Sequence, residues 1–290
     1  MEAVLQYIAN GLMVGGIYAL IALGIVLIYK STSVFNFAIG QMMMFGAFFF
    51  WMTTEQFGLP IWAGLVVSLT GSVVVGLLIE RFTLRPLIGQ PLLSAVLVTL
   101  ALVYFLNGVA MGIWGAYPYR LPDFLPGAQV SIGGVVFPHD LLWSFFIAMT
   151  LFVLLLLFYQ RTRMGLAMRA TAESHQIAQA RGINVRTIFS MSWALCGLVA
   201  AVCGMLLAFR LGVSQFLSLV GLKAFPAVLF GGLDSIPGAL IGGITVGVLE
   251  NLAGGLIAPW MMEITPYIIL LLVLIVRPEG LFGLKRIERI

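Results

Sequence analysis

Long apolar runs separated by short polar segments dominate the pattern along this chain. The runs cover roughly residues 8–29, 36–54, 60–80, 92–115, 140–159, 187–209, 236–257 and 264–276. Most of them reach about 20 residues, which is the length that crosses the hydrocarbon core of a bilayer as a helix. Barrel strands would show short alternating segments, which are absent from this sequence. The pattern predicts an all-α, polytopic bundle of transmembrane helices.

The stretch 214–234, SQFLSLVGLKAFPAVLFGGLD, fits this pattern less well. It is apolar enough for a membrane, but Lys223, Pro226 and the Gly231-Gly232 pair are expected to interrupt a helix. We therefore predict a broken or short spanning helix here, and about eight to nine spans in all.

Basic residues constrain the orientation of the spans, because cytoplasmic loops carry an excess of Lys and Arg. Segment 116–139 holds only Arg120 against Asp123 and is predicted outside. The resulting topology has nine crossings, with the N-terminus outside and the C-terminus cytoplasmic. The alternative has eight crossings with 214–234 re-entrant, and it places the N-terminus in conflict with a charge cluster. The basic clusters used are Arg81 with Arg85, the arginines of 161–186, and Arg277 with Lys285, Arg286 and Arg289.

The helices before residue 116 and those from residue 187 onward run in opposite senses in this topology, which predicts inverted halves. Interrupted helices at matching positions of such halves line the substrate path. The candidates are 31–46 and 214–234, each the second element of its half. Glycines at 238, 242, 243 and 247 form small-xxx-small patterns and predict close helix contacts.

The polar segment 161–186, RTRMGLAMRATAESHQIAQARGINVR, is predicted to be a cytoplasmic loop. It carries five of the 15 Lys and Arg residues of the chain and a single glutamate. Its alanines and glutamines favour a helix, which Gly182 would end. The arginines alone can be an orientation signal. Because Leu166, Met168 and Ile177 interleave with the charges, the segment also predicts docking to a soluble partner.

Composition supports a membrane protein and argues against several functions. The chain is 61% hydrophobic and 9% charged, with a mean hydropathy of +1.11, so lipid must act as its solvent. The net charge of +4 lies at helix ends, which gives no indication of nucleic-acid binding. Cys196 and Cys203 are too far apart on one helix for a disulfide. With only His139 and His175, we expect no metal site, no cofactor and no catalytic residues. No cleavable signal peptide is expected.

Four pieces of the chain resemble the permease subunits of branched-chain amino acid ABC importers, the LivH type. The pieces are GGIYALIALGIVLIYKSTSVFNFAIGQMMMFGA (15–47), TRMGLAMRATAESHQIAQARGINV (162–185), FGGLDSIPGALIGG (230–243) and RPEGLFG (277–283). Their order and spacing, and the chain length, are also similar to that family. Related permeases for urea, short amides and similar solutes share the pattern. The resemblance implies one transmembrane permease domain over residues 1–290, in a bacterial inner membrane.

The resemblance also implies partners. A permease of this kind pairs with a second, homologous permease; two cytoplasmic ATPase subunits drive the pair, and a periplasmic binding protein delivers substrate. The absence of a GxxxxGK[ST] sequence agrees with ATP being bound elsewhere. In the family the central loop docks into a groove of the ATPase. The resemblance places this role on Gly165, Arg169, Ala170, Glu173, Ala178 and Gly182, although the fuller EAA signature of other ABC importers is incomplete here.

Polar residues within the apolar runs are candidates for the translocation pathway. Amides in hydrocarbon need partners, so interhelical hydrogen bonding and pore lining are both open for them. Methionines offer an adaptable apolar wall but are also ordinary core residues. An intramembrane charge is a functional candidate by default. The candidates are Asn36, Gln41, Met43, Lys223, Glu250 and Asn251.

The leading hypothesis is therefore a permease for leucine, isoleucine and valine or related small solutes, driven by ATP hydrolysis on other subunits. A urea or amide permease of the same family is the alternative. An ion-coupled secondary transporter would need a titratable mid-membrane group, for which Glu250 is the acidic candidate. The predicted coupling loop argues against a passive channel. The exact solute, the partner permease and the substrate contacts stay open at this stage.

Overall fold

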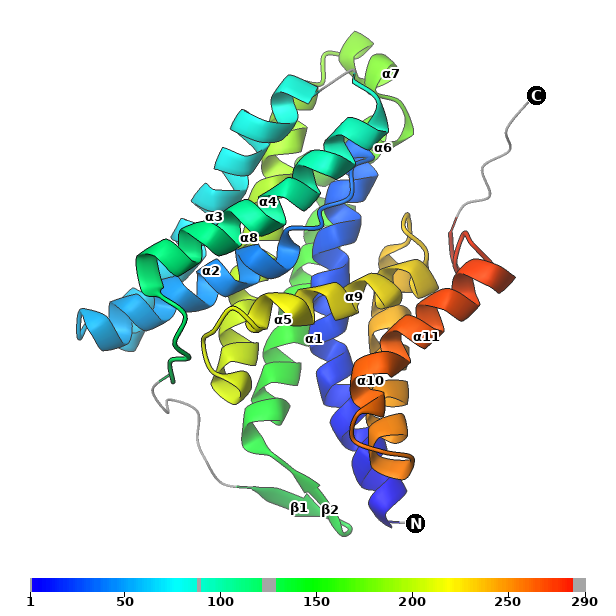
Figure 1. Cartoon of the computed structure of the whole chain (residues 1–290). Helices are drawn as coiled ribbons and strands as arrows, with labels where there is room; N and C mark the ends of the chain where they lie inside the picture. Colours follow the sequence, from blue (N-terminus) through cyan, green and yellow to red (C-terminus); the bar gives the residue numbers. More distant parts are fainter. Residues whose placement is uncertain (1, 88–89, 122–128, 284–290) are drawn as a thin grey trace. The chain divides into compact units, whose positions relative to one another are not determined.

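A computed structural model describes residues 2–87, 90–121 and 129–283 of the chain (Figure 1). All nine predicted apolar runs, including 214–234, are helical. They form α1 Glu2–Thr32, α2 Ile39–Trp51, α3 Ile61–Ile79, α4 Leu92–Trp114, α5 His139–Arg161, α8 Val185–Leu211, α9 Leu217–Gly231, α10 Ile236–Leu256 and α11 Met261–Val276. The predicted all-α class is confirmed. Asp123 of the predicted outer loop and Lys285, Arg286 and Arg289 lie outside the described residues.

Helix length and composition support a polytopic membrane protein. Within the described residues, six helices are long and apolar enough to cross a membrane: α1, α3 with its continuation to Leu87, α4, α5, α8 and α10. Two shorter apolar helices, α9 and α11, accompany them. Helix α2 continues through a π-helical turn, Met52–Gln56, and α3 through a second one, Glu80–Leu84, and a 3₁₀ turn, Arg85–Leu87.

The predicted interruption near residues 31–46 is present. Helix α1 ends at Thr32, Ser33 has a φ of 56°, and α2 begins only at Ile39. Of the two alternatives for 214–234, the short helix is present and the broken one is wrong, because α9 continues through both Lys223 and Pro226 as one helix of 15 residues. Proline removes one N–H donor from a helix, but α9 does not end at Pro226. The glycine pair acts as predicted, since α9 ends at Gly231.

The described chain divides into two compact units. One contains the described parts of Leu27–Phe124 and Val153–Leu222. Within it α2, α3 and α8 pack against one another, side by side in Figure 1. Glycines make these contacts close: Gly204 faces the backbone of Met43, Gly197 faces that of Ser72, and Gly76 faces that of Trp193. A side chain at any of these glycines would overlap the facing backbone.

The other unit contains the described parts of Met1–Val26, Leu125–Phe152 and Lys223–Ile290. Here Gly243 of α10 faces Ala19 of α1, and Gly247 faces Gly15. Within α9 and α10, Gly238 packs on Gly231 and Gly242 on Ala227. The close contacts predicted from the small-xxx-small glycines are confirmed, because two backbones can approach closely only where no side chain intervenes.

This second unit also holds a short hairpin that the sequence analysis did not predict. Strands β1 Val130–Ile132 and β2 Val135–Phe137 pair antiparallel, with Ile132 opposite Val135. The two-residue turn is Gly133-Gly134, with φ of 59° and 83°, a conformation that favours glycine. The side-chain amide of Gln6 bonds both backbone groups of Val136, at 2.6 and 2.7 Å, which attaches the hairpin to α1.

Candidate functional site

The polar segment 161–186 folds as two short helices rather than the single helix expected from its composition. Helix α6 spans Arg163–Glu173 and α7 spans His175–Ala180. The break is at Ser174, whose backbone is extended and whose hydroxyl accepts a hydrogen bond from Ile177 N. Serine favours this capping position over a helix interior because its side chain satisfies a free N–H. Thr162 caps α6 in the same way, through Gly165 N.

Two of the predicted coupling residues attach α6 to the end of α5. Gly165 is buried against the carbonyl groups of Phe158 and Tyr159, where a Cβ would not fit. The Arg169 guanidinium donates to the Tyr159 carbonyl and lies 5.5 Å from the centre of the Tyr159 ring. Both residues therefore hold the loop to its own membrane helix.

Two more predicted residues fix α7. Ala178 is buried in a small apolar cluster with Val185 and Phe189, against which Ile183 packs. Gly182 has a φ of 83°, and its N–H bonds the Gln179 carbonyl at 2.9 Å. The predicted helix stop at Gly182 is confirmed. This turn lets the chain reverse into α8 directly after α7.

Other residues of the two helices are exposed, and two of these are large and apolar. Leu166 of α6 is 59% exposed and Ile177 of α7 is 65% exposed. Glu173 is exposed and Ala170 is half-buried, and among the described residues no ion pair joins Glu173 to Arg169. Four arginines of the segment are also exposed: Arg161, Arg163, Arg181 and Arg186. The segment thus exposes both apolar and basic side chains.

Helix α7 also contacts the end of α1. His175 Nε2 lies 3.1 Å from the Ser31 carbonyl oxygen, and the His175 ring packs edge-on against Phe189 of α8 at 5.5 Å. The Ser31 hydroxyl in turn donates to Ser192 Oγ of α8 at 2.6 Å. The loop is therefore connected to two membrane helices, α1 and α8, at the point where α1 ends.

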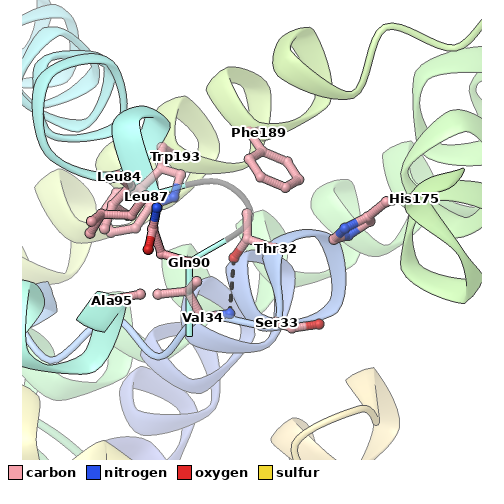
Figure 2. A pocket seen from close by; sticks show the side chains of 10 residues that line it. All are labelled: Thr32, Ser33, Val34, Leu84, Leu87, Gln90, Ala95, His175, Phe189 and Trp193. Carbon is pink, nitrogen blue, oxygen red and sulfur yellow. Dashed lines mark hydrogen bonds between the residues drawn. The ribbon is translucent and has the colours of Figure 1, made fainter. Parts of the chain in front are cut away.

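A cavity of about 260 Å³ adjoins this contact. Its wall includes Thr32 and Val34 of the interrupted segment, His175 of α7, and Phe189 and Trp193 of α8 (Figure 2). The Thr32 hydroxyl accepts from Val34 N at 3.2 Å, the bond drawn in Figure 2. The cavity leaves free volume beside the junction of the loop and the membrane helices.

A buried carboxylate strengthens the neighbouring junction of α3 and α8. Arg85 binds Glu80 through two nitrogens, at 3.0 and 2.9 Å, and both residues contact the Ser190 hydroxyl. Two-pronged arginine binding of this kind fixes geometry as well as charge. Sequence reasoning used Arg85 only as an orientation signal and did not select Glu80.

The pathway candidates of the first half are buried around α2. Asn36 is fully buried; its Oδ1 accepts from Ala38 N at 3.0 Å, and its Nδ2 lies 3.4 Å from Met42 Sδ and 3.6 Å from Cys196 Sγ. Gln41 is buried with Oε1 unpartnered within the described residues. Met43 packs its backbone on Gly204. For Asn36 these contacts favour interhelical and turn hydrogen bonding over pore lining.

The candidates of the second half divide into a pair and a separate residue. Lys223 Nζ binds Glu250 Oε1 at 3.2 Å and Glu263 Oε1 at 2.9 Å. Asn251 donates to Gly247 O of its own helix at 3.0 Å. The structure therefore brings Lys223 and Glu250 together and adds Glu263, which sequence reasoning missed. An acidic residue in the first turn of an apolar helix was the available signal.

Comparisons with known proteins agree with this picture. A family model described as "Branched-chain amino acid transport system / permease component" matches residues 7–274. The high-affinity branched-chain amino acid transport permease BraD of Pseudomonas aeruginosa is 31% identical over 99% of this chain and 98% of its own length. LivH of Escherichia coli K12, a permease of the same kind, is 30% identical over 99% and 97%. The fructose import permease FrcC of Rhizobium meliloti is 26% identical over 86% of this chain and 69% of its own length.

The match of the family model to nearly the whole chain and the two full-length relatives agree with the apolar helices and with the resemblance found in the sequence. The chain belongs to the family of branched-chain amino acid transport permease components, and it is a multi-pass membrane transport subunit rather than an enzyme.

Proposed function

We propose that this chain is the membrane-spanning permease of an ATP-driven importer for leucine, isoleucine and valine. Two full-length relatives are branched-chain amino acid permeases by name, which supports the substrate class. ATP hydrolysis and substrate capture then belong to separate subunits, namely two cytoplasmic ATPases and an external binding protein. A second, homologous permease completes the pathway, and residues 1–290 act as one transmembrane domain in the cell's inner membrane.

The observation that carries the proposal is that some residues of α6 and α7 hold the segment in place while others are exposed. Gly165, Arg169 and Ala178 face inward and hold the segment, whereas Leu166 and Ile177 project outward. Exposed apolar side chains with a polar rim are typical of a docking surface. A loop that only set orientation would need the arginines but not these two side chains. We infer that the outer face of α6 and α7 docks on the ATPase.

The contacts of α7 suggest how movement is passed on. An ATPase that shifts α7 also shifts His175, which lies against Ser31 at the end of α1 and against Phe189 of α8. The cavity beside this contact provides volume into which side chains can move. Packed interfaces change between discrete arrangements rather than bending continuously. We infer that the junction of α1, α7 and α8 transmits movement from the ATPase to the transmembrane path.

The first prediction tests the docking surface with Ile177→Asp. The chain is co-expressed with its ATPases and partner permease, and binding-protein-dependent uptake of radiolabelled leucine is measured in vesicles. Burying an isoleucine contributes about 1.5–3 kcal/mol, so we expect ATPase association and uptake to fall about tenfold or more. Gln179→Asp, a change at another exposed position of the same helix, is the matched control and is expected to stay within about twofold of wild type.

Three results would contradict parts of the proposal in different ways. Uptake by the Ile177→Asp variant at the wild-type rate would show that docking does not use the outer face of α6 and α7. Uptake by the wild-type complex that proceeds without ATP, or follows a proton gradient, would show that the chain is not part of an ATP-driven importer. ATP turnover without leucine uptake would leave the importer standing and change the solute, with urea, amides and, given the FrcC similarity, sugars tested next.

A further inference from the structure

A charged cluster lies among the apolar helices of one unit. Lys223 of α9 is bound between Glu250 of α10 and Glu263 of α11, at 3.2 and 2.9 Å. The exposed fractions of the three side chains are 11%, 4% and 74%, respectively. The fully buried Tyr18 of α1 lies beside the Glu250 carboxylate. Four helices of this unit therefore contribute to one polar site.

The cluster is unbalanced in charge and in hydrogen bonding. One ammonium group serves two carboxylates, and Glu250 Oε2 has no hydrogen-bond partner in the described part of the chain. Desolvated charges cost free energy unless they are paired and hydrogen-bonded. Replacing a buried ion pair with packed apolar residues often leaves a protein as stable or more stable, so stability alone gives little reason for this arrangement. The Glu250 carboxylate, which also lies within hydrogen-bonding reach of the Tyr18 hydroxyl, thus keeps one buried oxygen that can accept from a further cation or donor.

We propose that Lys223, Glu250 and Glu263 form a binding site for the zwitterionic head of the amino acid substrate. The inference rests on the proposed import of amino acids and adds the residues that recognise them. The substrate α-carboxylate binds Lys223 in place of Glu263. Its α-ammonium is then bound by Glu250 Oε2 and by the released Glu263 carboxylate.

Exchange of partners explains why such a site suits a transport path. A zwitterion entering apolar surroundings loses its hydration, and this cost is offset when each of its charges finds an opposite one. The number of ion pairs rises by one, because the protein's Lys223–Glu263 pair is replaced by two pairs with the substrate. Glu263 is exposed, so it can leave Lys223 without disrupting the core. A site that exchanges pairs also releases its cargo by the reverse step.

The same chemistry predicts selectivity. A molecule that carries only a carboxylate gains Lys223 but leaves the released Glu263 without a cation, and one that carries only an ammonium leaves Lys223 with Glu263. Both should bind more weakly than the zwitterion. Sugars and urea have no formal charge to exchange and should not compete.

The second prediction concerns binding of radiolabelled leucine to the purified permease complex in nanodiscs without the binding protein. Competitors are unlabelled leucine, 4-methylpentanoate, which lacks the ammonium, and isopentylamine, which lacks the carboxylate. A charged hydrogen bond contributes about 1.5–3 kcal/mol, so leucine should compete about tenfold better than either analogue. In Glu263→Gln and Glu250→Gln the advantage of leucine over 4-methylpentanoate should fall about tenfold.

The ratio between leucine and its analogues separates recognition from damage. A variant that merely disturbs the fold weakens all three competitors together and leaves their ratio unchanged, which would overturn the proposal. Glu263→Gln alters an exposed side chain and should retain the fold, while Glu55→Gln, an exposed carboxylate in the other unit, is the control that keeps the wild-type ratio.

Two further outcomes would also overturn the site. One is a wild-type complex that binds leucine no better than the singly charged analogues, and the other is a wild-type complex that binds none of the three. ATP-dependent leucine uptake, measured after the same purified complex is reconstituted in proteoliposomes with its binding protein, separates failure of the site from failure of the proposed function. If uptake persists while binding shows no charge selectivity, the zwitterion site is wrong and the importer stands. If uptake itself is absent, the proposed function fails.

Discussion

At the scale of single residues, Asn36 shows what a buried amide does at a helix interruption. Its side chain accepts from Ala38 N just before α2 begins, and its amide nitrogen faces Met42 and Cys196. An asparagine that bonds the backbone two residues ahead stabilises a turn. The sequence left pore lining and hydrogen bonding equally open for Asn36, because both require an amide in an apolar run.

The third prediction is that Asn36→Ala destabilises the protein. The substitution leaves the N–H of the buried Ala38 without its acceptor, which costs about 1–3 kcal/mol. Thermal unfolding of the detergent-solubilised permease, followed by circular dichroism, should show a lower midpoint. Asn107→Ala is the matched control, because Asn107 Oδ1 has no hydrogen-bond partner among the described residues. Equal midpoints for the two variants would contradict a structural role for Asn36.

At the scale of helices, glycines determine how closely neighbours pack. Gly40 of α2 lies against the backbone of Ser218 in α9, and Gly221 of α9 lies against Gly40. The two elements that the sequence predicted as matching positions of the two halves therefore contact each other in one unit. In membranes, where helix association gains little from burying apolar surface, such close packing supplies much of the attraction.

The fourth prediction compares Gly40→Ala with Gly108→Ala. A Cβ at position 40 would overlap the Ser218 carbonyl, so α2 and α9 must separate and lose packing; we expect a cost of about 1–3 kcal/mol. A Cβ at position 108 in the middle of α4 meets nothing within 4 Å, and alanine there gains helix propensity. Unfolding midpoints of both variants decide the matter. A midpoint for Gly40→Ala at or above that of Gly108→Ala would show that the contact is not tight.

The sequence predicts where the helices lie along the chain better than it predicts which helices contact one another. Every apolar run is a helix because lipid leaves the backbone few other ways to satisfy its hydrogen bonds. The break at Ser174 was missed because helix propensity is a weak signal next to a local side-chain cap. The hairpin at Gly133-Gly134 had a recognisable turn signal that was not used. Glu263 could not be paired with Lys223, since their distance depends on how α9 and α11 pack.

At the scale of the whole molecule, the placement of its charges predicts the direction in which the chain crosses the membrane. The hairpin segment precedes α5, and the basic pair α6 and α7 follows it. Helix α5 has 23 residues and an apolar composition, long enough to cross the bilayer once. If α5 crosses once, we predict from the chain order that the hairpin segment and α7 face opposite sides of the membrane. The positive-inside rule predicts α7 in the cytoplasm and the hairpin outside.

The fifth prediction tests this orientation with single cysteines. Cys196 and Cys203 are buried, so a membrane-impermeant maleimide should leave the wild-type protein almost unlabelled. Ser131→Cys in the hairpin and Gln179→Cys on α7 introduce exposed thiols on the two sides of α5. In spheroplasts the reagent should label Ser131→Cys at once and Gln179→Cys only after the membrane is permeabilised. The reverse order would invert the topology and place α6 and α7 where no cytoplasmic ATPase can reach them. Labelling of both from one side would mean that α5 does not cross, and the count of spans would then have to change with it.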